Sequence, residues 1–263
     1  MSPESFKHKK YLGQHFLQDA GVAHKFVESL SFSASYQTIV EIGPGTGALT
    51  ELLIQKDTPH ELYLVEIDRT LAAYLKHTYP SIQSRILVSD FLTLQLDKLF
   101  CGPIAIIGNF PYNHSSQILF KLLAHRSQVQ EVVCMVQKEV AERMAAKPGS
   151  RAYGAPSVLL QAFYTIEYLF TVTPAQCKPP PKVYSAVVRL QRNRMEQLFC
   201  DEATFFKVVK TGFQQRRKKL RNALRPLGLS EDLASLAILE QRAEQLTVAD
   251  FIALTQVITQ LMA

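Results

Sequence analysis

The sequence has few cysteines, and their positions exclude several classes of protein. They are Cys101, Cys134, Cys177 and Cys200, and no two of them form a Cys-x-x-Cys pair. Zinc sites usually need such pairs, so we predict no metal site, and the spacing does not indicate a disulfide framework. A reduced, cytoplasmic protein is the simplest interpretation.

Long apolar runs are also missing. No stretch approaches the ~18 consecutive apolar residues that a membrane-spanning helix needs. Residues 1–10 are polar and basic, so we expect neither a signal peptide nor a transit peptide there. The sequence therefore predicts a protein without a membrane partner.

Acidic residues are absent from one basic stretch. Residues 205–226 contain eight Lys and Arg and no Asp or Glu, in a chain whose net charge is +6 and whose pI is about 9.1. A basic surface favours a polyanionic partner. The alternative is a solvated helix face with no partner, and the charge run alone does not decide between the two.

The order of predicted elements indicates an α/β fold. Strand-like apolar runs occur at residues 38–42, 61–66, 85–88, 104–108 and 131–136, and helical patterns at residues 48–56, 69–78, 115–124 and 138–146. This alternation predicts a mostly parallel, Rossmann-like sheet with helices on both faces. With 263 residues and 47% hydrophobic content, the chain can bury a substantial core.

The later part of the chain changes character. We predict a helix at residues 155–164 and strands at residues 166–172 and 186–190, with a stiff, extended Lys-Pro-Pro-Pro-Lys segment at residues 178–182 between the strands. After Arg192 the pattern is purely helical. We therefore predict two domains, residues 1–192 and a small helical domain of residues 193–263.

A glycine-rich loop follows the first predicted strand and opens a helix. It contains Gly43, Gly45 and Gly47, in the pattern Gly-x-Gly-x-Gly that begins after Glu41-Ile42. Glycines let a backbone turn tightly and approach a ligand closely, and a helix N-terminus suits an anion. Any strand-to-helix turn can be rich in glycine, so the loop alone is a weak signal.

Acidic residues at the ends of the next two strands make the loop more specific. Glu66 lies 19 positions after Gly47, where an acid can accept both ribose hydroxyls, and Asp90 could accept from an adenine amino group. The alternative is that Asp68 and Asp90 cap helices. No P-loop lysine follows the glycines, which favours S-adenosylmethionine over a nucleoside triphosphate.

The tetrapeptide Asn109-Phe110-Pro111-Tyr112 directly follows the strand at residues 104–108. Ligands of open α/β sheets bind at such carboxyl ends. The Asn109 oxygen and the Phe110 carbonyl could accept the two hydrogens of an exocyclic amine, while Pro111 stiffens the backbone and Tyr112 offers a ring for stacking. The alternative is a Pro-Tyr turn that only closes the strand.

Seven segments together resemble a known family, the rRNA adenine dimethyltransferases. The similarity runs from Tyr11 to the C-terminal helices, and its segments are residues 12–17, 41–47, 65–68, 109–112, 137–140, 179–183 with 185–190, and 213–218. The family includes a bacterial small-subunit enzyme, its eukaryotic counterpart and the more distant macrolide-resistance methyltransferases. The Gln-Arg-Arg-Lys sequence at residues 215–218 is similar to the bacterial small-subunit branch.

The resemblance implies an S-adenosylmethionine-dependent methyltransferase fold and activity. Its substrate would be the 6-amino groups of two adjacent adenosines, in the hairpin loop near the 3′ end of small-subunit rRNA, and each would receive two methyls. The partner would be an assembling small ribosomal subunit, and we expect a monomer. Cofactor contacts in the family match His15, Leu17, Gly43, Glu66, Asp90 and Asn109.

Three positions depart from the family pattern. Asn is usual at His15, Leu is usual at Phe110, and an aromatic residue is common at Cys177. An imidazole can still form hydrogen bonds, and a backbone carbonyl survives the exchange of Leu for Phe. Tyr112 is therefore the stacking ring that the sequence supports.

The basic stretch fits the same interpretation. If residues 205–225 form one helix, Val209, Phe213, Leu220 and Leu224 share its inner face. Pointing largely away from that face are Lys218, Lys219, Arg221 and Arg225, with Arg216 and Arg217 at its flanks. The residues that we predict to bind RNA phosphates are Arg216, Arg217, Lys218, Lys219 and Arg221, with Lys7, Lys9, Lys10, Lys178 and Lys182 as further candidates.

Other activities remain alternatives. A macrolide-resistance enzyme would act on large-subunit rRNA, and DNA-adenine or protein-glutamine methyltransferases usually carry Asn-Pro-Pro-Tyr, where this chain has Phe110. A non-catalytic RNA-binding assembly factor on the same scaffold is a further alternative, although Glu66, Asp90 and Asn109 are all retained.

Overall fold

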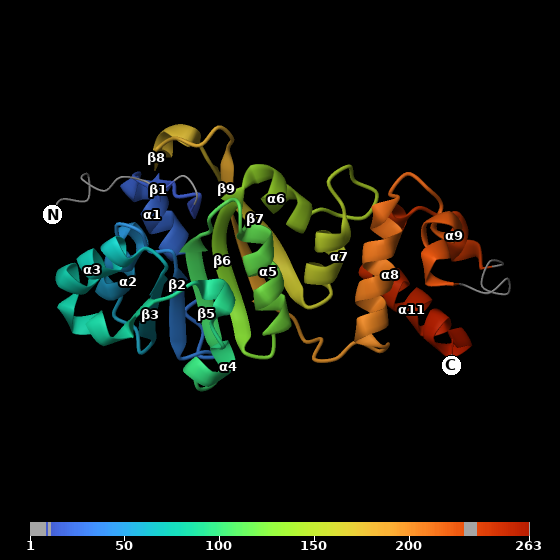
Figure 1. Ribbon diagram of the computed structural model, residues 1–263, viewed down its shortest axis with the longest axis horizontal. Helices are drawn as coiled ribbons and strands as arrows, with labels where there is room; N and C mark the ends of the chain where they lie inside the picture. The colour runs from blue at the N-terminus through green and yellow to red at the C-terminus, as the bar shows by residue number, and fades with distance from the viewer. Residues whose placement is uncertain (1–8, 10–11, 229–235, 263) are drawn as a thin grey trace. The chain divides into compact units, whose positions relative to one another are not determined.

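The computed structural model describes residue 9, residues 12–228 and residues 236–262 (Figure 1). The chain divides into two compact units, Met1–Ala141 with Ile166–Arg192, and Glu142–Thr165 with Asn193–Ala263. The chain passes from the first unit to the second after Arg192, which is where we expected a domain boundary. Residues 142–165 group instead with the second unit, because the helix α7 (Ala155–Gln161) contacts α8 (Glu202–Gln214) and α11 (Val248–Met262).

A seven-stranded sheet organises the first unit, in the order β4-β3-β2-β5-β6-β9-β7. The strands are β2 (Thr38–Ile42), β3 (Glu61–Glu66), β4 (Ile86–Val88), β5 (Ile104–Asn109), β6 (Val129–Gln137), β7 (Tyr164–Val172) and β9 (Ser185–Arg192). Four neighbouring pairs are parallel, and β6 pairs with β9 in the antiparallel sense. The predicted, mostly parallel sheet is confirmed.

The strand order reverses direction between β2 and β5. The chain first builds outward from β2 to β3 and β4, and then returns to add β5 and β6 on the other side. Such a reversal leaves a crevice at the carboxyl ends of the two central strands, where ligands of open α/β sheets bind. The glycine loop leaves β2 at this edge, and Asn109 ends β5 there.

Helices cover both faces of the sheet. Residues of α1 (Ala20–Val27), α2 (Ala48–Gln55) and α3 (Arg69–Thr78) share one buried apolar cluster with alternate residues of the strands, such as Ile39 and Ile107. In Figure 1 the helix α5 (Ser115–Ala124) lies in front of the sheet, and the short helix α4 (Leu96–Leu99) lies at the lower end of the strands. Because strand side chains alternate, Val40 and Ile106 face the side opposite to that cluster.

Smaller elements complete the first unit. The strands β1 (Phe16–Leu17) and β8 (Cys177–Lys178) form an antiparallel pair. The short 3-10 helices are η3 (Pro80–Arg85), η4 (Phe91–Thr93) and η5 (Pro174–Gln176). The β1–β8 pair joins the N-terminal segment to the segment that precedes β9, and both segments contribute to the site described below.

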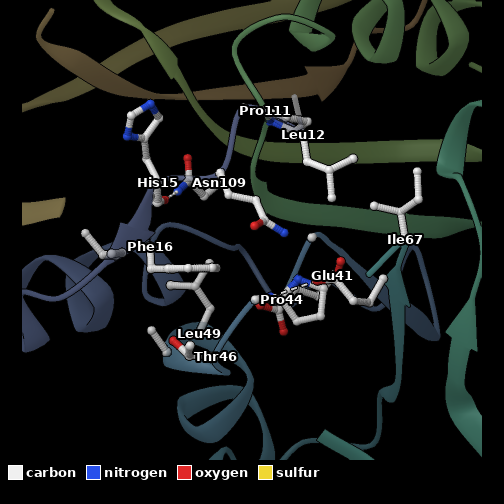
Figure 2. Close-up of a pocket in the computed structure, with 17 residues that line it drawn as sticks. Leu12, His15, Phe16, Glu41, Pro44, Thr46, Leu49, Ile67, Asn109 and Pro111 are labelled. Carbon is white, nitrogen blue, oxygen red and sulfur yellow. Dashed lines mark hydrogen bonds between the residues drawn. The ribbon is translucent and has the colours of Figure 1, made fainter. Parts of the chain in front are cut away.

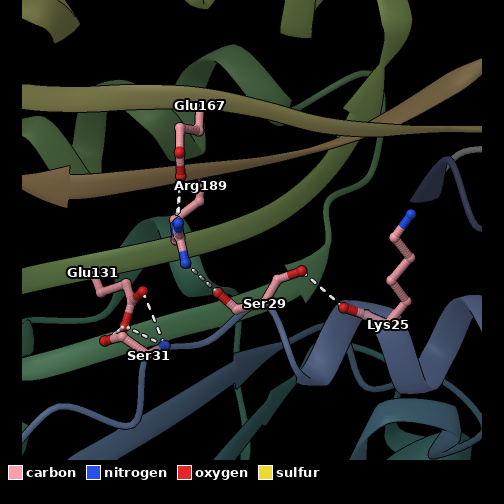
Figure 3. A network of polar contacts seen from close by, with 6 residues as sticks. All are labelled: Lys25, Ser29, Ser31, Glu131, Glu167 and Arg189. Carbon is pink, nitrogen blue, oxygen red and sulfur yellow. Dashed lines mark hydrogen bonds and ion pairs between the residues drawn. The ribbon is translucent and has the colours of Figure 1, made fainter.

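A buried carboxylate anchors the connection between α1 and β2 to the sheet (Figure 3). Glu131 of β6 accepts hydrogen bonds from the backbone N–H and the hydroxyl of Ser31, and from the Tyr36 hydroxyl at 2.8 Å. Nearby, Arg189 of β9 pairs with Glu167 of β7 and donates to the Ser29 carbonyl. The network lies toward the amino end of β6, so it stabilises the fold away from the strand ends that carry the site.

The second unit is helical apart from the start of β7. Besides α7, α8 and α11 it contains α9 (Leu220–Ala223), η6 (Arg225–Leu227), η7 (Ala237–Glu240), η8 (Ala243–Gln245) and the last three residues of α6 (Lys138–Met144). Phe205, Val209 and Phe251 are fully buried in its core. No helix among the described residues is long and apolar enough to cross a membrane.

The prediction of one continuous basic helix is wrong. The helix α8 ends at Gln214, and α9 begins only at Leu220. The cause is a tertiary contact, because the Leu220 N–H donates to the Gln241 carbonyl at 2.8 Å and Lys219 forms a β-bridge with Arg242. Val209, Leu220 and Leu224 are nevertheless buried, so these predicted inner-face residues do point inward.

Candidate functional site

A cleft opens at the carboxyl edge of the sheet, beyond the ends of the paired strands β2 and β5 (Figure 2). It is lined by the N-terminal segment 12–17, the glycine loop after β2, and the ends of β3 and β5. Its volume is about 680 Å³, including space open to solvent.

Backbone geometry explains the glycines of the loop. Gly43, Gly45 and Gly47 have φ values of +66°, +58° and +90°, which side chains rarely tolerate. A Cβ atom at Gly45 would lie 2.8 Å from the Phe16 ring, and one at Gly47 would lie 2.8 Å from the Tyr79 hydroxyl. The loop therefore keeps this path only with glycine at these positions.

Two buried carboxyl groups lie beside the loop. Glu66 is 3% exposed, and it accepts from the backbone N–H groups of Gly45 at 3.1 Å and Asp68 at 2.9 Å. Burial raises its pKa. Glu41 accepts from the Thr50 hydroxyl at 2.6 Å, and burial raises its pKa to about 8. Both line the cleft, but the sequence indicated a role only for Glu66.

Asn109 lies at the opposite wall of the cleft. Its side-chain nitrogen donates to the His15 carbonyl at 2.5 Å, and its Oδ1 atom has no hydrogen-bond partner within the described part of the chain. The preceding residue lets β5 approach β2, since a Cβ atom at Gly108 would lie 2.3 Å from the Ile42 carbonyl oxygen. Asn109 thus presents an acceptor while its donor side holds the N-terminal segment.

Phe110 and Tyr112 of the tetrapeptide lie in different surroundings. The Phe110 side chain is fully buried, and its N–H donates to the Met135 carbonyl at 3.0 Å. The Tyr112 ring stacks on His15, with centroids 5.1 Å apart and planes at 26°, and its hydroxyl bonds to Ser185. Burial raises the pKa of Tyr112. One face of the predicted stacking ring is therefore covered by His15.

His15 is held by several contacts. Its Nδ1 atom bonds to the Pro179 carbonyl at 2.7 Å, and in Figure 2 its ring points away from Glu41 and Pro44. The imidazole therefore contacts the tetrapeptide side of the cleft and leaves the glycine loop to other residues. Leu17 is buried and pairs with Cys177 between β1 and β8.

Asp90 lies outside the residues that line the cleft. It caps the short helix η4, and its Oδ1 atom accepts from the Leu92 N–H at 2.9 Å. Asp90 therefore has the position of a helix cap, which was the alternative interpretation of this residue. Asp68 is also a helix cap, because it caps α3, and it pairs with Lys9 at 2.9 Å.

The predicted site residues thus fall into two groups. Those that line the cleft are His15, Leu17, Gly43, Gly45, Glu66, Asn109 and Pro111, and those that do not are Gly47, Asp90, Phe110 and Tyr112. Residues to which the sequence assigned no individual role also line it, among them Leu12, Phe16, Thr46, Leu49 and Ile67. Ile67 is 48% exposed, and its sequence signal was its place after a strand-end acid, within the segment 65–68 that resembles the family.

Comparison with known proteins agrees with this arrangement. The family model described as ribosomal RNA adenine dimethylase matches residues 5–260. The chain belongs to this family. The resemblance stated from the sequence is confirmed over almost its whole length.

Relatives are similar to this dimethylase-family chain along nearly the full length of both proteins. It is 50% identical over 256 residues to ribosomal RNA small subunit methyltransferase A of Cytophaga hutchinsonii, which covers 97% of this chain and 99% of that protein. It is 49% identical to the protein of the same name from Parabacteroides distasonis, over 95% of this chain and 93% of the relative.

Solved structures support the fold. A dimethyladenosine transferase from Plasmodium falciparum superimposes with a TM-score of 0.78 at 23% identity, covering 94% of this chain and 98% of that chain. The 23S rRNA methyltransferase ErmE superimposes with a TM-score of 0.67 at 24% identity, covering 91% and 99%. The fold is the Rossmann-like methyltransferase fold, with a helical unit after it, as predicted.

The basic residues predicted for RNA binding in this dimethylase-family chain differ in their contacts. Arg216 pairs with Glu244 at 2.5 Å and donates to the carbonyls of Ser150 and Arg151. Lys219 and Arg221 both pair with Glu240, at 2.8 and 2.6 Å. The hydrogen bond from Lys219 is the main cause that lowers the pKa of Glu240.

Arg217 and Lys218 are different. Both are exposed, and within the described part of the chain neither side chain has a hydrogen bond or ion pair. They line an open groove of the second unit together with residues 149–151. Lys7 and Lys10 lie outside the described residues, whereas Lys9 pairs with Asp68. Among the described residues no group of His, Cys, Asp and Glu could hold a metal ion.

Proposed function

We propose that the protein transfers methyl groups from S-adenosylmethionine to the 6-amino groups of two adjacent adenosines in the 3′-terminal hairpin loop of small-subunit (16S) rRNA. Each adenosine would receive two methyls. The observation that carries the proposal is the convergence of Gly43, Glu66 and Asn109 on one cleft at the β2–β5 crevice. Family membership and relatives named small subunit methyltransferase A support the substrate.

The residues of the cleft fit this cofactor. A left-handed glycine turn leaves room for a ligand close to the backbone, and the N-terminus of α2 begins directly after it, which suits a carboxylate. The buried Glu66 carboxylate suits ribose hydroxyls, and the exposed Ile67 beside it suits the flat face of a base. When bound, S-adenosylmethionine supplies an electrophilic methyl group.

Asn109 and Phe110 would hold the target amine. The free Oδ1 of Asn109 and the Phe110 carbonyl would accept the two amine hydrogens. The adenine amine is a poor nucleophile because its lone pair is delocalised into the ring, and two acceptors favour a pyramidal nitrogen. This stabilisation acts mainly in the transition state. No covalent enzyme intermediate is needed for in-line displacement, and a second transfer requires room for one methyl beside these acceptors.

Tyr112 would stack on the target base with the face that His15 leaves open. The base must leave its own stack at a cost of a few kcal/mol, which is least in an unpaired loop. Stacking on an aromatic ring can offset roughly 1–3 kcal/mol of that cost. His15 would then act as the support behind Tyr112, in addition to lining the cofactor cleft.

We further propose that the second unit binds rRNA phosphates through its basic groove. Arg217 and Lys218 are the candidates with unoccupied side-chain donors among the described residues of the groove, and Arg216, Lys219 and Arg221 would contribute charge from their ion pairs. The substrate would be an assembling small subunit in the cytoplasm.

One experiment tests the proposal as a whole. The protein is incubated with undermethylated small subunits and labelled S-adenosylmethionine, and the label is mapped along the rRNA. We expect it at two adjacent adenosines of the 3′-terminal hairpin loop. Label in large-subunit rRNA would favour the macrolide-resistance type of activity, and the absence of label would favour a non-catalytic assembly factor.

A further inference from the structure

Two large apolar side chains are exposed next to each other at the start of β9. Val183 is 44% exposed and Tyr184 is 53% exposed. Other exposed large hydrophobic residues, such as Ile54, Leu99 and Phe199, are separated along the chain. Single exposed apolar residues need no explanation, but an adjacent pair beside a candidate active site indicates a contact surface.

The pair lies at the edge of the sheet that carries the site. Because β9 is antiparallel to β6, its first residue Ser185 pairs with Gln137, the last residue of β6. The same edge holds the ends of β2 and β5, with the glycine loop and Asn109. Ser185 also bonds to the Tyr112 hydroxyl, so Tyr184 is one residue from a direct contact with the tetrapeptide.

The backbone of this segment is held firmly. The Tyr184 carbonyl accepts from the Lys138 N–H at 2.9 Å, and the Pro179 carbonyl bonds to His15. Upstream, Cys177 and Lys178 form β8 against β1. Tyr184 is therefore an exposed ring on a fixed support, which loses little conformational freedom when a ligand stacks on it.

The charges around the ring favour nucleic acid. Lys178 and Lys182 are exposed on the same short segment as Val183 and Tyr184. Cations interleaved with aromatic and apolar residues are typical of surfaces that bind single-stranded nucleic acid, where bases stack on rings and cations track phosphates. A hydrophobic protein partner would not require these flanking cations.

We propose that Tyr184 is a stacking platform for the nucleotide next to the adenosine that enters the site, with Lys178 and Lys182 near its phosphates. This inference rests on the proposed function. When the target base leaves the loop, its neighbour loses a stacking partner, and a fixed ring at the mouth of the site replaces it. Because the two target adenosines are adjacent, the platform would hold one while the other reacts.

Substitutions test the platform with undermethylated small subunits as substrate. We expect Tyr184→Ala to lower kcat/KM about tenfold, mainly by raising KM for the subunit, while the affinity for S-adenosylmethionine measured by calorimetry is unchanged. Tyr184→Phe retains the ring and should behave like the unchanged protein. Leu99→Ala, at a similarly exposed residue of α4, is the matched control.

A fluorescence measurement tests base stacking directly. The sequence contains no tryptophan, so the Tyr184→Trp variant would carry a single indole reporter, and Leu99→Trp would be its control. We expect a protein-free RNA with the sequence of the 3′-terminal hairpin to quench the indole fluorescence of the Tyr184→Trp variant and to leave that of the control unchanged.

The outcomes separate this inference from the proposed function. Full activity of Tyr184→Ala, or no quenching of Tyr184→Trp, would overturn the platform even if the unchanged protein labels small-subunit rRNA. Weaker binding of Tyr184→Ala to subunits without quenching by RNA would indicate a contact with a ribosomal protein and would also overturn it. Failure of the unchanged protein to label rRNA is the separate result that defeats the proposed function.

Discussion

The cleft of the first unit and the basic groove of the second unit are built by different kinds of contact. In the cleft, Glu66 bonds to backbone N–H groups of Gly45 and Asp68, both within the motifs that follow the strand ends. These are backbone groups, which are present whatever the side chain, although Gly45 lies 21 positions from Glu66. Arg216, Lys219 and Arg221 of the second unit instead pair with the side chains of Glu244 and Glu240, 19 to 28 positions away in sequence.

That difference decides how far each site can be inferred from local sequence. The groups that orient Glu66 are backbone N–H groups, which the glycine loop and the strand-end motif carry whatever their side chains, so the chemistry of this acid is visible in the pattern. A run of cations does not contain its acidic partners. Only the fold distinguishes Arg217 and Lys218, whose side chains are unpaired among the described residues, from Arg216, Lys219 and Arg221, which are paired.

The largest effect is expected at Asn109. Replacing Asn109 with Ala removes an acceptor that we propose acts on the amine in the transition state, so turnover should fall by at least about a hundredfold. Rates on undermethylated small subunits and calorimetric binding of S-adenosylmethionine measure the two functions separately.

The same side chain also holds the His15 carbonyl, which allows a second explanation. If Asn109 only fixed the N-terminal segment, the variant would lose affinity for S-adenosylmethionine and keep its maximal rate. A large loss of rate at saturating cofactor distinguishes catalysis from this supporting role. Near-normal turnover of the Asn109→Ala variant would contradict the catalytic role of Asn109. It would also remove the expected contrast between this variant and the variants of the basic groove.

A second test concerns the buried acid beneath the loop. Glu41 has an ordinary pKa near 4.5 and a pKa of about 8 in the folded protein, because burial disfavours its charge. The folded state thus binds the proton more tightly than the unfolded chain. The free energy of unfolding should fall as the pH rises from about 4.5 to about 8, by up to about 1.4 kcal/mol per pH unit.

Glu41→Gln removes this dependence and keeps an acceptor for Thr50. The variant should gain stability over the unchanged protein as the pH rises from 5 to 8, in urea unfolding measured at several pH values. Glu61→Gln, at an exposed acid of β3, is the control and should show no growing difference. A stability difference that is constant with pH would mean that Glu41 is charged in the folded state.

Much of the fold could be predicted because local patterns and tertiary structure agree. The ranges expected for β2, β3, α3 and α5 match the structure residue by residue, and β5 extends one residue further to include Asn109. These strands are largely buried on both faces, so their apolar runs are nearly continuous, and glycine or an acid marks each end.

What could not be predicted depends on contacts distant in sequence. The break between α8 and α9 follows from a bond between Leu220 and Gln241, and the cover of Tyr112 by His15 joins residues 97 positions apart. Ile67 enters the cleft only because β3 ends beside the glycine loop. Sequence periodicity carries no information on such contacts.

A third test separates structure from binding in the groove. Arg216 bridges Glu244 and the carbonyls of Ser150 and Arg151, so Arg216→Ala should lower the free energy of unfolding by about 2 kcal/mol. Arg216→Lys should recover only part of this, because an ammonium cannot form the same forked contacts. Urea unfolding measures both variants, and Arg217→Ala serves as the control with little change. Equal stability of the Arg216 and Arg217 variants would remove the distinction between paired and free cations.

The smallest effect on stability, and the sharpest test of the groove, is expected for Arg217 and Lys218. Their joint replacement by Ala should change the free energy of unfolding by less than about 0.5 kcal/mol, since both side chains are exposed and unpaired among the described residues. If each binds one rRNA phosphate, the slope of log affinity against log salt concentration should fall by roughly 1.5.

The matched variant is Lys219→Ala with Arg221→Ala, which removes the same charge from residues paired with Glu240 and should change the slope less. Equal slopes for the two double variants would mean that the total charge of these residues determines RNA binding. Pairing with Glu240 would then not reduce the contribution of a cation to that binding.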